Sequence, residues 1–100
     1  MEKRKPHYNL VTVQSAVRLA EADAFTATAL IGVQEMGLKI AEAIEVVCSM
    51  SQSDFYKSMT TLSSSRIWQD VYHPETSVGK AYVKLTLRQD GAIVIQFKEK

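Results

Sequence analysis

The octapeptide Asp54-Phe55-Tyr56-Lys57-Ser58-Met59-Thr60-Thr61 lies where two kinds of sequence pattern meet. Before it, apolar residues recur at helical spacings, and after it the pattern changes to the two-residue period of strands. Tyr56 and Lys57 place a phenol beside an ammonium group, and the Ser/Thr-rich continuation is typical of a strand with one solvated face. Two interpretations remain open: an edge strand whose lysine aids solubility, or a strand that carries functional groups.

The overall composition is that of one globular domain. The 100 residues are 46% hydrophobic and 23% charged, with a net charge of +1, which fits a single core and argues against wholesale disorder. Cys48 has no partner for a disulfide and no Cys or His neighbour at zinc-ligand spacing, so we expect a small buried residue on a helix. No signal peptide or membrane span is predicted, so the expectation is a soluble cytoplasmic protein.

Three helices are predicted in the first half of the chain. The first follows the N-cap residue Asn9 and runs to about residue 22, and the second follows Thr26 or Thr28 and ends at Gly37. The third ends near Met50. The apolar stripes that predict them are Leu10, Val13, Val17 and Ala20; Ala29, Leu30, Val33 and Met36; and Ile40, Ile44 and Val47. Each stripe is interpreted as core.

Four strands are predicted in the second half, over residues 57–62, 67–72, 81–88 and 92–98. His73-Pro74-Glu75 interrupts them, because proline lacks the amide proton that a central strand needs. The Asp90-Gly91 pair predicts a hairpin between the last two. If that hairpin buries Ile93, Ile95 and Phe97, Lys98 shares the solvated face with Tyr82 and Lys84.

The pattern therefore predicts an α+β fold in which the helices cover one side of a mainly antiparallel sheet and the other side is polar and basic. The sequence offers no carboxylate pair, metal-ligand cluster or Ser-His-Asp set, so no metal or cofactor is predicted. The groups expected on the polar side suit a polyanion. They are Lys57, Gln69, Tyr72, His73, Tyr82, Lys84, Arg88 and Lys98.

RNA is a polyanion that can be cleaved with little help, because its own 2'-hydroxyl attacks the adjacent phosphate. The protein then only has to move protons and neutralise charge on phosphorus. Clustering of Lys57, Lys84 and Lys98 is expected to lower a lysine pKa toward the useful range. The alternative is a sheet that binds RNA or an acidic protein without reaction. The basic arm from Lys3 to Lys5 is either a solvated terminus or a phosphate contact, and His7 is interpreted as structural.

Several blocks of the sequence resemble the MqsR family, the motility quorum-sensing regulator toxins. These blocks are Met1-Glu2-Lys3-Arg4, Ser53 to Thr61, Ile67-Trp68-Gln69-Asp70-Val71-Tyr72, the Tyr82 strand and Phe97-Lys98-Glu99-Lys100. The resemblance implies a RelE-like α+β fold over residues 1–100. It also implies a metal-independent and ribosome-independent mRNA interferase that cleaves at GC-containing triplets such as GCU.

The resemblance also implies site residues and a partner. The family's proposed catalytic residues fall on Lys57, Gln69, Tyr82 and Lys98, and we expect Tyr56, His73, Lys84 and Arg88 to contact RNA. The implied partner is a zinc-binding, helix-turn-helix antitoxin of the MqsA kind, which inhibits the toxin and represses transcription. The expected role is that of a toxin in a stress-response toxin–antitoxin system.

Overall fold

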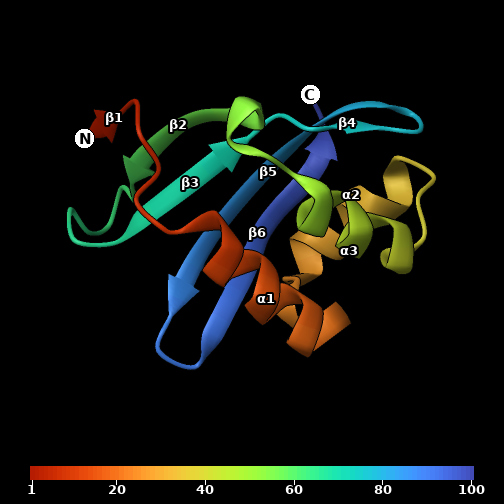
Figure 1. Ribbon diagram of the computed structural model, residues 1–100, viewed down its shortest axis with the longest axis horizontal. Coiled ribbons are helices and arrows are strands. Elements are labelled where there is room, and N and C mark those ends of the chain that lie inside the picture. The colour runs from red at the N-terminus through yellow and green to blue at the C-terminus, as the bar shows by residue number, and fades with distance from the viewer.

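Three α-helices precede most of the strands along the chain in the computed structural model, which describes residues 1–100 (Figure 1). The helices are α1 (Leu10–Ala20), α2 (Ala27–Glu35) and α3 (Ile40–Ser49), with short 3-10 turns at Glu21–Ala24 and Gln52–Asp54. The strands are β1 (Glu2–Lys3), β2 (Phe55–Thr60), β3 (Trp68–Tyr72), β4 (Glu75–Thr76), β5 (Gly79–Arg88) and β6 (Gly91–Glu99).

The strands form one six-stranded sheet in the order β1-β2-β3-β5-β4, with β6 paired to β5. Every pairing between these strands is antiparallel. The two-residue strand β4 folds back on the start of β5 after His73 and Pro74 break the chain direction. The α+β fold class is therefore confirmed.

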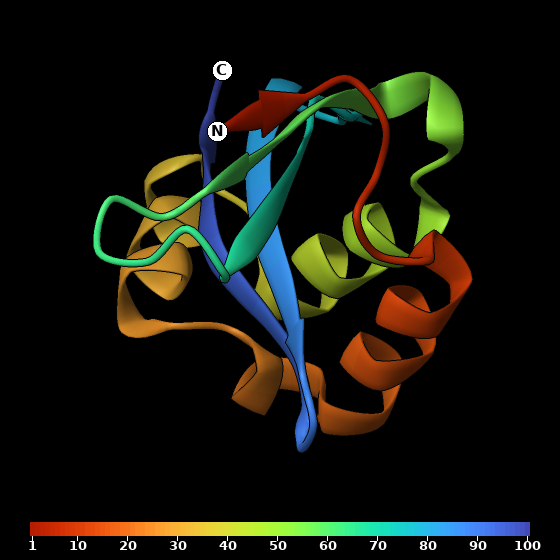
Figure 2. The same ribbon diagram turned by 90° about the vertical axis from the view of Figure 1, so that its left-hand side faces the viewer.

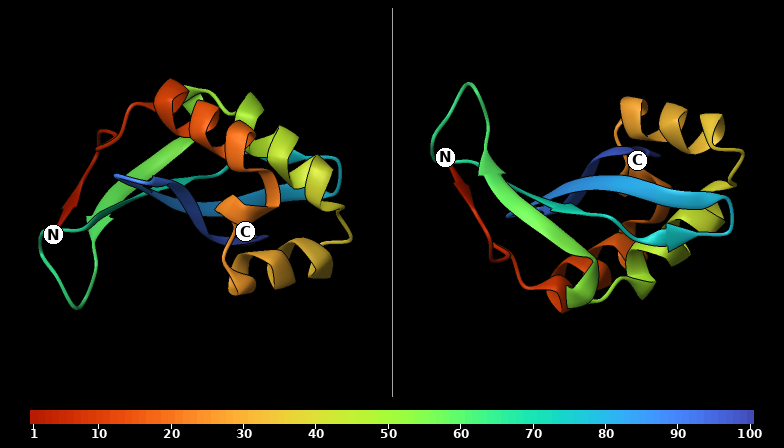
Figure 3. Two further views of the ribbon diagram at one scale, coloured as in Figure 1. Left: turned by 90° about the horizontal axis from the view of Figure 1, so that it is seen from below. Right: turned by 90° about the horizontal axis from the view of Figure 1, so that it is seen from above.

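The helices lie on two sides of β6. Helices α1 and α3 pack against each other and cover one face of the sheet, whereas α2 runs along the β6 edge (Figures 2 and 3). A Cβ atom added at Gly32 of α2 would lie 1.8 Å from the carbonyl oxygen of Phe97. Glycine thus lets the helix backbone cover the edge of the sheet, which would otherwise present unpaired backbone groups.

The predicted helix ends agree well with the structure. The Asn9 side chain accepts the amide of Thr12, and the Thr26 side chain accepts the amide of Ala29, so both N-caps are confirmed. Gly37 adopts the left-handed conformation with φ of 79°. The first helix ends two residues earlier than predicted, at Ala20, because the chain turns into a 3-10 segment at Glu21.

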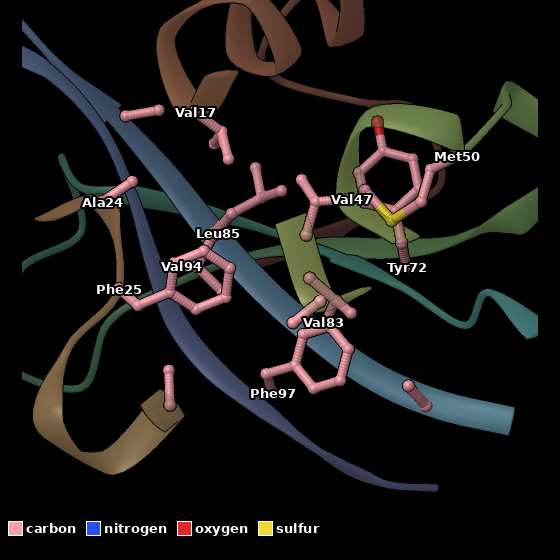
Figure 4. Packing of buried hydrophobic residues seen from close by; sticks show 14 of the residues in the cluster. Val17, Ala24, Phe25, Val47, Met50, Tyr72, Val83, Leu85, Val94 and Phe97 are labelled. Atoms are coloured by element: carbon pink, nitrogen blue, oxygen red, sulfur yellow. The ribbon is translucent and has the colours of Figure 1, made fainter. Parts of the chain in front are cut away.

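The core lies between the sheet and helices α1 and α3. Figure 4 shows Val17 of α1 and Val47 of α3 near Val83 and Leu85 of β5. All four side chains are fully buried. Burial of such side chains contributes roughly 1.5–3 kcal/mol each, so the interface holds the helices on this face and leaves the other face to solvent.

Two predictions about the faces were wrong. In β6 the buried residues are Ala92, Val94 and Phe97, while Ile93 and Ile95 are only half-buried. The β5–β6 register shifts between Lys84 and Leu85, so strict alternation breaks at this bulge.

Tyr72 is the other exception, because it faces the core. It is 1% exposed, and its ring packs edge-on against Phe55 at a centroid distance of 5.5 Å. Burial raises the pKa of Tyr72 to about 12, so the phenol stays neutral and is removed from the polar face.

The N-terminal segment is docked on the sheet. Strand β1 pairs with β2, and the fully buried carboxylate of Asp70 accepts the backbone amides of His7 and Tyr8 at 2.9–3.1 Å. The His7 ring stacks on Trp68, which agrees with the structural role predicted for it. Among the helices, none combines the length and apolar character that crossing a bilayer requires.

Candidate active site

The sheet face away from α1 and α3, which we call the basic face, carries two parallel rows of side chains that are polar except for Val71. The first row crosses the sheet as Tyr56, His73, Tyr82 and Lys98. The second row crosses it as Lys57, Val71, Lys84 and Gln96, which are successive partners in β2, β3, β5 and β6. Antiparallel pairing therefore assembles on one surface residues that are up to 42 positions apart, from Tyr56 to Lys98.

The first row is a continuous run of aromatic rings that ends at a cation. The rings of Tyr56 and His73 stack at 4.4 Å, and the His73 and Tyr82 centroids are 5.7 Å apart. The ammonium group of Lys98 lies 5.2 Å from the Tyr82 ring centroid. Such an arrangement offers flat surfaces for stacking of unpaired bases and a charge for the phosphate between them.

The second row supplies two more lysines. Lys57 and Lys84 flank Val71, which is fully buried between them. Burial, followed by the charge of Lys98, lowers the pKa of Lys84. The direction expected for a clustered lysine is thus found at Lys84, with burial as the main cause and Lys98 as the smaller one.

Lys57 behaves differently because it has a carboxylate partner. Its ammonium group donates to Glu2 of β1 at 2.5 Å, and this hydrogen bond raises the pKa of Lys57. The expectation of a lowered pKa at this lysine was wrong, since a partner 55 positions away along the chain outweighs the neighbouring cations. Lys57 therefore stays protonated and is suited to hold positive charge.

The first row contains groups in complementary protonation states. Burial is the main cause that lowers the pKa of His73, with smaller contributions from Lys100 and Lys80. Burial also raises the pKa of Tyr82, against the opposing effect of Lys57. At neutral pH the imidazole can therefore accept a proton while the phenol retains its own.

Two further predicted site residues lie beyond these rows. Gln69 pairs with Met59 and follows the alternation of Lys57 and Val71, which puts it on the basic face about 7 Å further along β3. Arg88 pairs with Gly91 at the hairpin, six residues beyond Tyr82 and hence about 20 Å away. The structure brings together Tyr56, Lys57, His73, Tyr82, Lys84 and Lys98, with Gln69 adjacent and Arg88 remote.

Three neighbours of the site were not among the predicted site residues. The guanidinium of Arg4 lies 5.7 Å from the Tyr56 ring, Glu2 pairs with Lys57, and Gln96 lies opposite Lys84. Alternation with Lys98 was a usable signal for Gln96. The positions of Arg4 and Glu2 depend on docking of β1, for which the sequence carries no local signal.

The largest depression of the surface lies elsewhere, between α3 and β4. It has a volume of about 420 Å³ and contains none of the basic-face residues. Its charged side chains are Glu45, Asp54 and Glu75, which suit a polyanion poorly. We therefore place the candidate site on the basic face, where the aromatic and cationic groups converge.

The fold and the basic face together define a small α+β protein whose sheet carries a row of aromatic rings and several lysines on one face. Comparison with known proteins identifies the family to which the chain belongs. The family model described as "Motility quorum-sensing regulator, toxin of MqsA" matches residues 5–99. The chain belongs to this family of motility quorum-sensing regulator toxins, and the resemblance seen in its sequence is confirmed. It is also 43% identical, over the full length of both chains, to a protein from Escherichia coli (strain K12) named "mRNA interferase toxin MqsR".

Proposed function

We propose that this protein is an mRNA interferase, an endoribonuclease that acts as the toxin of a toxin–antitoxin system. The observation that carries the proposal is the first row of the basic face, where His73, Tyr82 and Lys98 lie side by side. Family membership and the named relative support the same activity. Residues 1–100 act as one domain in this proposal.

The reaction is attack of a ribose 2'-oxygen on the adjacent phosphorus. The 2'-hydroxyl loses its proton to a base, the new oxygen–phosphorus bond forms, and the bond from phosphorus to the 5'-oxygen breaks. An acid returns a proton to that oxygen, which leaves a 2',3'-cyclic phosphate and a 5'-hydroxyl. Cations stabilise the negative charge that builds up on the phosphoryl oxygens.

The protonation states of the site suggest how these tasks are divided. His73 is the neutral group best placed to accept the 2'-hydroxyl proton, and the Tyr82 phenol can donate to the leaving oxygen. Lys57 and Lys98 hold the phosphate as cations, and Lys57 is kept protonated by Glu2. Gln69 contacts the RNA next to the reacting phosphate through its amide.

Several finer properties belong to the same proposal. Cleavage is expected at GC-containing triplets of the GCU type, without the ribosome, in the cytoplasm. The partner is a zinc-binding antitoxin with a helix-turn-helix domain, and the complex of the two proteins represses their own transcription. Co-expression with the product of the neighbouring gene should suppress toxicity and yield a complex that co-purifies. Unchanged toxicity without a complex would contradict this pairing.

The central test is incubation of the purified protein with a defined RNA in the presence of a chelator. We expect site-selective cleavage, and a single 2'-deoxy substitution at the cleaved position should abolish it, because the attacking oxygen is then absent. Cleavage of the 2'-deoxy RNA would mean that water attacks. RNA that is bound but stays intact at high protein concentration would instead support a binding module.

A further inference from the structure

A small groove lies between α2 and β6, next to the basic face. Its volume is about 150 Å³, and its lining includes Thr28, Ile31 and Glu35 from α2 with Gln96, Phe97 and Lys98 from β6. This volume equals that of about five water molecules at liquid density, at roughly 30 Å³ each. The groove is therefore suited to one flat ring system and not to an extended ligand.

The groove is continuous with the candidate active site. Lys98 lines it and also lies over the Tyr82 ring, while Gln96 lines it and pairs with Lys84 of the second row. A phosphate held by Lys98 would leave the base of an adjacent nucleotide at the mouth of the groove. One RNA strand can therefore occupy both sites.

The residues that line the groove determine which part of a nucleotide can bind there. Ile31 is 56% exposed and offers an apolar surface, whereas the carboxylate of Glu35 is an acceptor without hydrogens to donate. The negative charge disfavours a second phosphate in the groove. A carboxylate accepts readily from an exocyclic amino group on the edge of an unpaired base.

We propose that this α2–β6 groove binds the base next to the scissile phosphate and selects one with an exocyclic amino group. Guanine, cytosine and adenine carry such a group. Uracil instead offers a single ring N–H between two carbonyl oxygens, which repel a carboxylate. Glu35 is the specificity-determining residue, with Gln96 as a second hydrogen-bonding group. The inference rests on the proposed ribonuclease function and adds a base subsite to it.

The shape of the groove depends on the glycine in the middle of α2. Because the Gly32 backbone touches the Phe97 carbonyl, α2 lies close enough to β6 for Glu35 and Gln96 to line one groove. The subsite is thus built by the packing of the helix on the sheet edge.

The experiment compares cleavage rates of RNAs that differ only in the base on either side of the cleaved bond. Each amino-bearing base is paired with its amino-lacking analogue: guanosine with inosine, adenosine with purine riboside and cytidine with pyrimidin-2-one riboside. The wild-type protein should cleave the amino-bearing RNA about tenfold faster or more at one of the two positions, because a hydrogen bond to a charged group is lost in the analogue. Glu35→Gln should reduce this ratio by about tenfold, since the amide presents one acceptor and no charge.

The matched control is Glu21→Gln, which removes a carboxylate from an exposed turn outside the groove. This variant should keep the wild-type ratio. A ratio near one for the wild-type protein at both positions would overturn the subsite and leave the ribonuclease function standing. An unchanged ratio in Glu35→Gln would also overturn the subsite and leave the ribonuclease function standing.

Affinity provides a readout that does not depend on cleavage. RNAs made uncleavable by a 2'-deoxy substitution should bind the wild-type protein more tightly when they carry the amino-bearing base, and Glu35→Gln should remove the difference. If the wild-type protein cleaves no RNA, the proposed function fails, and the affinity difference alone decides the groove. Equal affinities for both members of each pair would then overturn the subsite.

Discussion

Tyr82 combines a phenolic hydroxyl with an aromatic ring, and replacing it with phenylalanine removes only the hydroxyl. Its phenol keeps its proton at neutral pH, and its ring lies between His73 and Lys98. Tyr82→Phe should lower the rate of single-turnover cleavage by about a hundred- to ten-thousand-fold, since a proton-transfer group is lost. RNA affinity should be nearly unchanged because the ring remains available for stacking.

Tyr56→Phe is the matched control for this prediction. Tyr56 lies at the far end of the same row, is exposed, and stacks on His73 in the same way that a phenylalanine would. Its variant should therefore cleave close to the wild-type rate. If Tyr82→Phe cleaves RNA at the wild-type rate, the phenol takes no part in proton transfer.

The pH dependence should identify the proton acceptor. Because the pKa of His73 lies below its usual value of 6.5, the imidazole is neutral at pH 7, and protonation as the pH falls through that pKa removes a base. The kcat/KM of the wild-type protein should therefore decline on the acidic side below pH 6.5.

His73→Gln should lower the rate and abolish this acidic limb. His7→Gln removes the other imidazole, which stacks on Trp68 away from the basic face, and should retain the limb. A limb that persists in His73→Gln would assign proton acceptance to another group.

At the level of secondary structure elements, the approach of α2 to β6 depends on Gly32. Glycine-to-alanine changes in helices usually stabilise a protein by about 0.5–1 kcal/mol. At this position the new Cβ would lie 1.8 Å from the Phe97 oxygen, so the helix must move. We expect Gly32→Ala to lower the free energy of unfolding by about 1–3 kcal/mol, as overpacking does, and to disturb the α2–β6 groove.

Gly37 provides the contrast, since no atom lies within 4 Å of a Cβ added there. Only its left-handed backbone conformation resists substitution, so Gly37→Ala should cost about 1–2 kcal/mol. Gly37→Asn should cost less, because asparagine tolerates that conformation, whereas Gly32→Asn should remain as harmful as Gly32→Ala. Urea denaturation measures all four variants, and a stabilised Gly32→Ala would contradict the close approach.

Docking of β1 depends on Asp70. Asp70→Ala would leave the amides of His7 and Tyr8 without acceptors, which should cost about 2 kcal/mol or more. The loosened segment should also weaken the Glu2–Lys57 pair, and so reduce cleavage and hydrogen-exchange protection in β1. Asp23→Ala, at an exposed position in the 3-10 turn after α1, should change neither. Full exchange protection of β1 in Asp70→Ala would show that other contacts hold the segment.

Across the whole molecule, a net charge of only +1 conceals a concentration of cations on one face. If Lys57, Lys84 and Lys98 each neutralise one phosphate, the slope of log Kobs against log salt for an uncleavable single-stranded RNA should be about −2. Replacing any of these three lysines with glutamine should reduce the magnitude of the slope by about 0.7. Lys39→Gln, at the N-terminus of α3, should leave the slope unchanged. A slope unaffected by the variants at Lys57, Lys84 and Lys98 would place RNA outside the basic face.

The elements of this protein could be predicted from short windows of sequence. The caps at Asn9 and Thr26, the stop at Gly37 and the Asp90-Gly91 hairpin depend on side chains and backbone within a few residues, so local pattern was sufficient. The same alternation placed Tyr82 and Lys84 on one face of β5. The family resemblance, carried by blocks such as that around Lys57, added the activity that spacing alone could not choose.

Tertiary structure decided what depends on contacts between distant parts of the chain. The bulge opposite Lys84 shifted the buried face of β6 to Val94, and β1 gave Lys57 a carboxylate partner that raises its pKa. The site itself, from Tyr56 through His73 and Tyr82 to Lys98, and the groove beside Glu35 exist only once the strands are paired and α2 covers the edge. A sequence pattern reports which way a side chain points along its own strand, whereas register and packing set which side chains meet across the sheet, and these depend on the energy of the whole core.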